Sequence, residues 1–183
     1  NADVNASDRM GGTPLMWSAA LGTPDTVALL IEKGANVNVS DKNGLTPLLW
    51  AASTGDPKTV ALLIQSKADI AVADNLTGDT ALMRAARNGK PDSLSALIAA
   101  KAAIEAKNRQ GMTPWLIACA NGKVEKLEML KAAGCDVAAK DSRGWNAVDH
   151  ARNRSDANRA EVLKYLEDNL KLKPAIAETQ GSK

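Results

Sequence analysis

Few residues of this sequence could carry out catalysis. His150, the single histidine, directly follows Asp149, and adjacent positions of a helix point in different directions, so the two are not expected to act together. Cys119 and Cys135 stand where related segments of the chain carry alanine, which favours buried packing over thiol chemistry. The sequence shows no glycine-rich phosphate loop, no zinc-ligand spacing and no convergent carboxylate pair. We therefore predict no enzymatic activity, no cofactor and no metal site.

Aromatic and cationic residues point to binding instead. Trp17 and Trp50 stand 33 positions apart, and tryptophan and arginine are the residue types that most often dominate protein–protein contacts. Apolar residues at the tips of predicted loops, rimmed by arginine, also have the composition of an interface. The candidate partner-binding residues are Trp17, Trp50, Leu45, Met112, Trp145, Arg84, Arg87, Arg109 and Arg143.

These candidates recur because the chain repeats a unit of 33 or 34 residues. Each unit opens on Thr-Pro-Leu or a variant of it, and the openings are Thr13, Thr46, Thr80, Thr113 and Asn146. Small residues, a glycine, an apolar stripe at helical spacing and a turn rich in Asp, Asn and Gly follow in order. Threonine can cap a helix whose first residue is proline, so each unit is predicted to hold two helices and a turn.

The repeated pattern resembles the ankyrin-repeat family, in which a β-turn and two antiparallel helices make one unit. The resemblance implies an all-α solenoid of stacked helix-turn-helix units with β-turn fingers. It also implies a concave face, lined by the fingers and the first helices, that binds a protein partner. Trp17 and Trp50 then lie on first helices, and Leu45, Met112 and Trp145 lie at exposed fingers. The alternative is that each tryptophan only packs at the edge of the core.

The predicted boundaries follow the repeat. They are 1–11 for the closing loop of an incomplete upstream repeat, then repeats over 12–44, 45–78, 79–111 and 112–144, a capping repeat over 145–172 and a flexible tail over 173–183. The 45–78 unit carries one extra residue in its finger. Lys67 and Lys101 occupy the position of Gly34 and Gly134, where a left-handed residue ends the second helix, and each should cost about 1 kcal/mol.

Composition and charge exclude several classes of protein. The chain has 183 residues, 45% of them hydrophobic, which is typical of a globular fold. A net charge of +2 does not favour nucleic acid as a partner, and the apolar runs are too short to cross a bilayer. The sequence starts at Asn1; if this reflects removal of a signal peptide the protein is periplasmic, and otherwise cytoplasmic.

The function that we expect is binding without catalysis. The leading hypothesis is a monomeric module that binds a protein partner with its concave face and so regulates or inhibits a partner enzyme. The first helices look more like those of bacterial ankyrin-repeat proteins than of metazoan ones. The alternative is a passive spacer or docking segment within a larger protein, and nucleic-acid binding is a minor third hypothesis.

Overall fold

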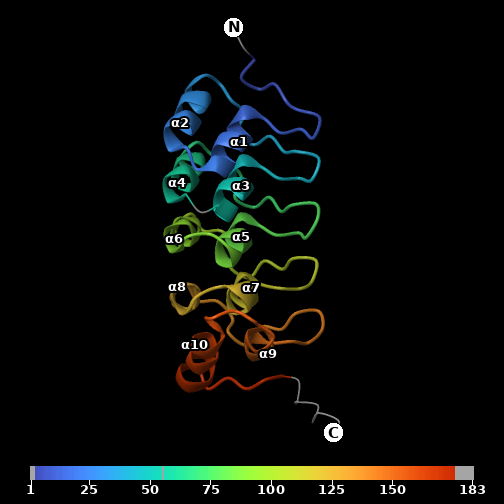
Figure 1. Cartoon of the computed structure of the whole chain (residues 1–183), viewed down its shortest axis with the longest axis vertical. Coiled ribbons are helices and arrows are strands. Elements are labelled where there is room, and N and C mark those ends of the chain that lie inside the picture. Colours follow the sequence, from blue (N-terminus) through green and yellow to red (C-terminus); the bar gives the residue numbers. More distant parts are fainter. Residues whose placement is uncertain (1–2, 55, 176–183) are drawn as a thin grey trace.

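The computed structural model describes residues 3–54 and 56–175. Helices alternate along the chain in pairs, and Figure 1 shows the pairs stacked from one end of the molecule to the other. The helices are α1 (Pro14–Leu21), α2 (Pro24–Glu32), α3 (Pro47–Thr54), α4 (Pro57–Gln65), α5 (Ala81–Arg87), α6 (Pro91–Ala99), α7 (Pro114–Asn121), α8 (Val124–Ala132), α9 (Ala147–Arg152), α10 (Arg159–Lys164) and the π-helical turn η1 (Tyr165–Asn169). Within the described ranges, the pairing of β-type is a single bridge between Ala73 and Thr80. The predicted all-α stack is confirmed.

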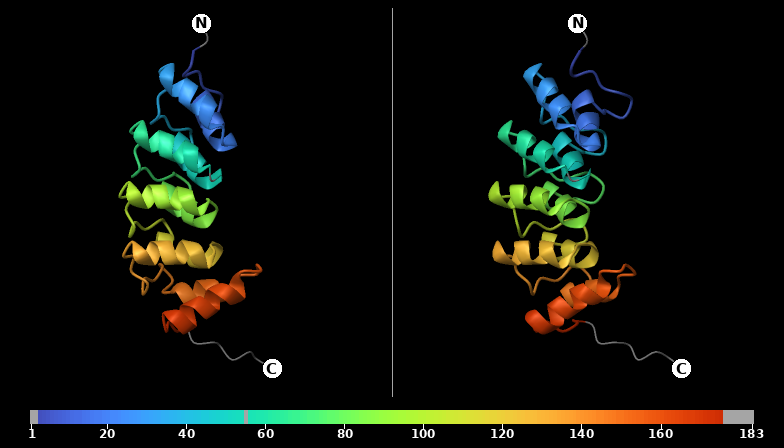
Figure 2. Two further views of the ribbon diagram at one scale, coloured as in Figure 1. Left: turned by 90° about the vertical axis from the view of Figure 1, so that its left-hand side faces the viewer. Right: turned by 60° about the vertical axis from the view of Figure 1, so that its left-hand side comes forward.

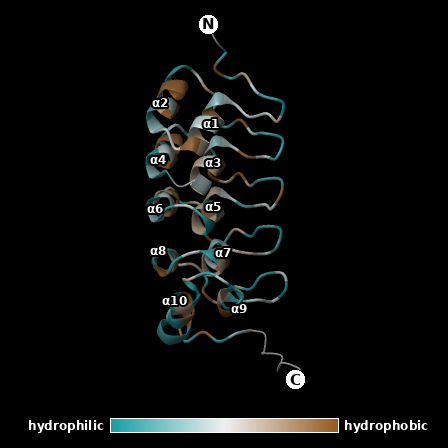
Figure 3. Cartoon of the chain, viewed as in Figure 1, coloured by the Kyte–Doolittle hydropathy of each residue, from teal (hydrophilic) through white to brown (hydrophobic). Residues whose placement is uncertain are grey.

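The stack is held together by two columns of helices. The first helices pack in the order α1, α3, α5, α7 and α9, and the second helices in the order α2, α4, α6 and α8. The pairs tilt progressively along the array (Figure 2), and helices of both columns carry apolar residues (Figure 3). Alanine pairs such as Ala51 and Ala52 are fully buried, so neighbouring helices approach closely. None of the helices in the described part of the chain is long and apolar enough to span a membrane.

Each first helix starts as its sequence predicts. The hydroxyl of Thr13 accepts the backbone N–H of Met16 at 3.4 Å, and Thr113 caps α7 in the same way. Proline holds the first helical position of α1 and α7, where its missing N–H has no partner to lose. In the last unit, Asn146 replaces threonine and accepts two backbone N–H groups. Short helices can therefore begin at defined residues without long apolar runs.

The loops that lead into the first helices form a row of fingers, at residues 6–13, 39–46, 72–80, 106–113 and 139–146. One backbone hydrogen bond joins each finger to the next: Lys42 to Met10 at 3.0 Å, Asn75 to Asn43 at 2.8 Å, Arg109 to Thr77 at 3.0 Å and Ser142 to Gln110 at 3.0 Å. Each finger carries an Asp or Asn near its start: Asp8, Asp41, Asp74, Asn108 and Asp141. The accepting carbonyl lies two residues after this residue, except at Thr77, which lies three residues after Asp74. The extra residue therefore stays within its own loop, whose tip carries Leu76 at 62% exposure. The row of backbone hydrogen bonds between fingers continues past it.

The second helices end in a left-handed residue. Lys67 has φ 64° and Lys101 has φ 62°, beside φ 88° at Gly34 and 87° at Gly134. The same pair of bonds closes each end: at Lys67, its N–H donates to Ile64 and the next N–H to Leu63. The predicted left-handed conformation at the two lysines is therefore confirmed.

Side chains in the loops after the second helices connect successive units. The amide of Asn38 donates to the Lys67 carbonyl at 3.3 Å, while its oxygen accepts the N–H of Asp69 at 2.8 Å. Asn5 makes the same two contacts with Gly34 and Asn36. These bridges repeat because the asparagines are one repeat apart.

Two basic side chains cap the ends of first helices across repeats. The Lys126 ammonium lies 2.9 Å from the Ala85 carbonyl oxygen and 3.1 Å from that of Ala86. Arg154 donates to the carbonyls of Cys119 and Gly122 at 3.0 and 2.8 Å. These four carbonyls lie at the C-terminal ends of α5 and α7, where helix oxygens lack partners within the helix. Each cation therefore ties one unit to the next.

The last unit closes the stack. Its second helix, expected over residues 158 to about 170, is split into α10 and η1, whose Val162 and Leu166 are fully buried. The chain then returns to α9, where Asn146 donates to the Lys173 carbonyl at 2.7 Å. The rest of the expected tail, residues 176–183, lies outside the described residues, as do residues 1 and 2 of the expected upstream loop.

Candidate functional site

The finger face consists of the fingers and the sides of α1, α3, α5, α7 and α9 that meet them. Trp17 on α1 is 55% exposed there, and its indole N–H donates to Asp8 in the adjoining finger at 3.3 Å. Trp50, one repeat later on α3, is half-buried and packs against the core. Packing at the edge of the core, the alternative given above, therefore accounts for part of the Trp50 side chain and for little of the Trp17 side chain.

The apolar finger residues are less exposed than expected. The expected exposure of Leu45 is wrong: the residue is only 6% exposed, because its side chain packs in the core. Its backbone N–H donates to the Asp41 carboxylate. Met112 and Trp145 are half-buried, and Met112 also packs against the core. The apolar residues at this finger position are therefore buried or half-buried, and they support the face more than they form its surface.

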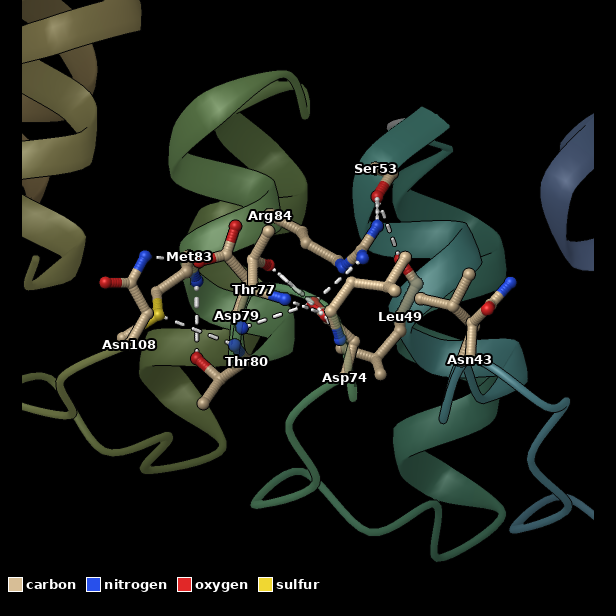
Figure 4. A network of polar contacts seen from close by, with 12 residues as sticks. Asn43, Leu49, Ser53, Asp74, Thr77, Asp79, Thr80, Met83, Arg84 and Asn108 are labelled. Carbon is tan, nitrogen blue, oxygen red and sulfur yellow. Dashed lines mark hydrogen bonds and ion pairs between the residues drawn. The ribbon is translucent and has the colours of Figure 1, made fainter. Parts of the chain in front are cut away.

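Arg84 and Arg87 are each held by a carboxylate of the finger that precedes their helix, and Figure 4 shows Arg84 beside Asp74. Arg84 lies 2.9 Å from Asp74 and also donates to Ser53 on α3 at 3.0 Å. Arg87 lies 2.7 Å from Asp79, whose other oxygen accepts the Asn108 amide at 2.7 Å. Both arginines are therefore parts of a network between fingers and helices, with side chains 19% and 32% exposed.

Asp74 is the centre of this network. Its carboxylate is fully buried and accepts N–H groups of Leu76, Thr77 and Asp79, besides the Arg84 guanidinium. Burial opposes the charged form, but the Thr77 N–H and then Arg84 outweigh it and hold the pKa of Asp74 well below its usual range. Asp74 is therefore ionised at neutral pH and fixes Arg84 in place.

Arg143 and Arg109 remain accessible. Arg143 stacks over the ring of Trp145, 4.1 Å from its centroid, and lies 3.0 Å from Asp141, although its side chain is still 59% exposed. Arg109 is exposed, and none of the ion pairs among the described residues includes it. These two residues can meet a partner at little cost in internal contacts.

His150 is part of the packing between finger and helix. Its Nε2 atom lies 3.2 Å from the Asp141 carboxylate, and its ring meets Trp145 edge-on at 5.6 Å. Burial lowers the pKa of His150, although the Asp141 charge acts in the opposite direction. Cys119 and Cys135 are both buried, as predicted.

The residues that the sequence analysis missed are the finger carboxylates. Asp8, Asp41, Asp74 and Asp141 hold the same finger position, and Asn108 replaces them in the fourth finger. In every finger this side chain accepts backbone N–H groups that shape the turn, for example Met10 and Gly12 at Asp8. Their recurrence at the repeat spacing was the available signal.

The comparisons with known proteins agree with this architecture. The family model described as "Ankyrin repeats (3 copies)" matches residues 1–74 and 82–173, and the gap falls on the finger with the extra residue. No curated protein matches the sequence. The match covers nearly the whole chain, and such repeats are protein–protein interaction modules that are typically non-catalytic. The chain belongs to the ankyrin-repeat family.

Proposed function

We propose that the protein binds one protein partner with its finger face and changes that partner's activity by occupying part of its surface. The observation that carries the proposal is Trp17, a large aromatic side chain 55% exposed on the finger face, beside half-buried Trp50. Tryptophan in such a position is typical of the residues that dominate binding energy. An enzyme inhibited or regulated by this occupancy, in a bacterium, is the specific case that we favour.

The accessible cations extend the proposed surface. Arg109 and Arg143 lie in the last two fingers, whereas Trp17 lies near the first two, so the face offers contacts along its length. Met112, Trp145, Arg84 and Arg87 are proposed to contribute at its floor, and Leu45 only from below. The alternative role, as a spacer or docking segment of a larger protein, would use none of these residues for recognition.

The test is affinity capture followed by a matched set of variants. Trp17→Ala should weaken binding of the captured protein by about 30-fold, which corresponds to about 2 kcal/mol. Glu32→Ala and Glu128→Ala, exposed on the second helices α2 and α8, are the controls and should leave affinity unchanged. If the controls lose binding while folded Trp17→Ala keeps it, the partner lies on another face. If no variant alters the captured set, the spacer role is favoured.

The regulatory part has its own measurement. Where the captured protein is an enzyme, its rate should change on addition of the parent chain and not on addition of Trp17→Ala at the same concentration. An enzyme that binds with no change in rate would leave the module as a scaffold.

A further inference from the structure

A pocket of about 190 Å³ opens between the first two fingers. Its walls include two indoles, Trp17 and Trp50, and two carboxylates, Asp8 and Asp41, with Met10 beside them. Aromatic faces and carboxylates together are the groups that bind organic cations. No cationic side chain among the described residues lies within ion-pair distance of either carboxylate.

Two other units show a side chain that can pair with such a carboxylate. The finger Asp faces the residue at the fourth position of the following first helix. At the third finger this residue is Arg84, 2.9 Å from Asp74, and at the fifth it is His150, 3.2 Å from Asp141. In the fourth unit the helix residue is apolar, Ile117, and the finger residue is neutral.

The second finger is the exception. Asp41 faces Trp50 in this register, and one oxygen of Asp41 accepts the N–H groups of Asn43 and Leu45 at 2.8 and 2.9 Å. Its other oxygen, Oδ2, has no hydrogen-bond donor in the described parts of the chain, and neither does the Trp50 indole have an acceptor there. By contrast, the equivalent pair in the first finger is joined, because Trp17 donates to Asp8 at 3.3 Å.

The opposite end of the molecule shows how these groups hold a guanidinium. In the last finger, Arg143 lies over the indole of Trp145 and pairs with the Asp141 carboxylate at the same time. The guanidinium is planar, stacks on aromatic rings and donates in a fork, so it suits this combination better than an ammonium group does. The pocket between the first two fingers has the indoles and the carboxylate without the cation.

We infer that this pocket binds an arginine side chain of the protein partner. The guanidinium lies against the indoles and donates to Asp41 Oδ2, and the thioether of Met10 contacts the methylene groups. The inference rests on the proposed function, because it identifies what the partner presents at the end of the finger face that carries Trp17.

The test uses the full chain and a probe, so it does not depend on finding the partner. The probe is Nα-acetyl-arginine methylamide, and Nα-acetyl-citrulline methylamide is its neutral isostere. The second cation is Nα-acetyl-lysine methylamide, whose side-chain amine is free. Indole N–H signals are followed by NMR during titration. We expect the arginine probe to shift the Trp17 and Trp50 signals, with lysine weaker and citrulline at least about 5-fold weaker. The signal of buried Trp115 is the internal control.

Variants separate the carboxylate from general charge. Asp41→Asn keeps an oxygen for the turn and should weaken the arginine probe at least about 5-fold, whereas Asp25→Asn, exposed on α2, should have no effect. Equal binding of citrulline, stronger binding of lysine, unchanged affinity in Asp41→Asn or the absence of any shift would each overturn the inference. If the probe fails while Trp17→Ala still loses the captured partner, the proposed function stands and only the arginine assignment is wrong.

Discussion

Replacing Lys67 by glycine should stabilise the protein by removing strain at the end of α4. The residue has φ 64°, a conformation that costs a residue with a Cβ about 1–2 kcal/mol and glycine almost nothing. Glycine also gains freedom in the unfolded chain, which offsets about 0.4–1 kcal/mol of the benefit. The net gain in the free energy of unfolding is about 0.5–1 kcal/mol. For a chain of this size, each kcal/mol raises the melting temperature by about 2–4 °C. Lys101→Gly at α6 should behave in the same way.

Urea unfolding of the parent and its variants measures the change. The matched controls run in the opposite direction: Gly34 has φ 88° and Gly134 has φ 87°, and a Cβ built on either meets no atom within 4 Å. Gly34→Ala should therefore lose about 1 kcal/mol through the backbone alone, without a steric clash. Lys67→Ala keeps the strained backbone and should change stability by less than about 0.5 kcal/mol. If Lys67→Gly destabilises the chain at an unchanged denaturant slope, the strain argument is refuted.

Three further outcomes concern the Asn38 bridge, the buried thiols and the Asp74 carboxylate. Ala71→Asn should gain about 1 kcal/mol in urea unfolding, because alanine stands where Asn38 bridges two units, and Asn38→Ala should lose a similar amount. Cys119 and Cys135 should react with a thiol reagent at neutral pH only as fast as the protein unfolds, since burial raises the pKa of both thiols, that of Cys135 to about 12; rapid labelling of the folded chain would contradict this. Stability should fall as the pH drops below about 4, because the pKa of Asp74 is lower in the folded state and the unfolded chain takes up the proton first; Asp74→Asn should make the fall shallower.

Much of the fold could be predicted because it depends on local chemistry repeated at a fixed spacing. Threonine and proline set where a first helix begins, and alanine pairs allow helices to approach. The same spacing identified the left-handed position from Gly34 and Gly134, and the two lysines there adopt it. Because each position occurs in several units, its conformation could be predicted from more than one residue.

The candidate site was harder to predict because exposure depends on neighbours that the repeat does not name. The repeat predicts an exposed finger position at Leu45, yet its side chain is buried in the core. Trp17 is exposed and Trp50 only partly, although both hold the same position of the repeat. Position within the repeat specifies direction, whereas position within the stack decides what lies in that direction.

The contacts of the charged residues also depend on neighbours in the stack, but the sequence names some of these neighbours. Arg84 is a predicted partner contact, and in the structure its guanidinium also pairs with Asp74, ten residues earlier in the chain. An arginine on the finger side therefore has to be read together with the finger residue that precedes it. Where finger and helix residues neutralise each other, the pair contributes to folding. Asp41 faces the Trp50 indole without a hydrogen bond between them, and its unused Oδ2 atom is the acceptor that we propose for the partner's guanidinium.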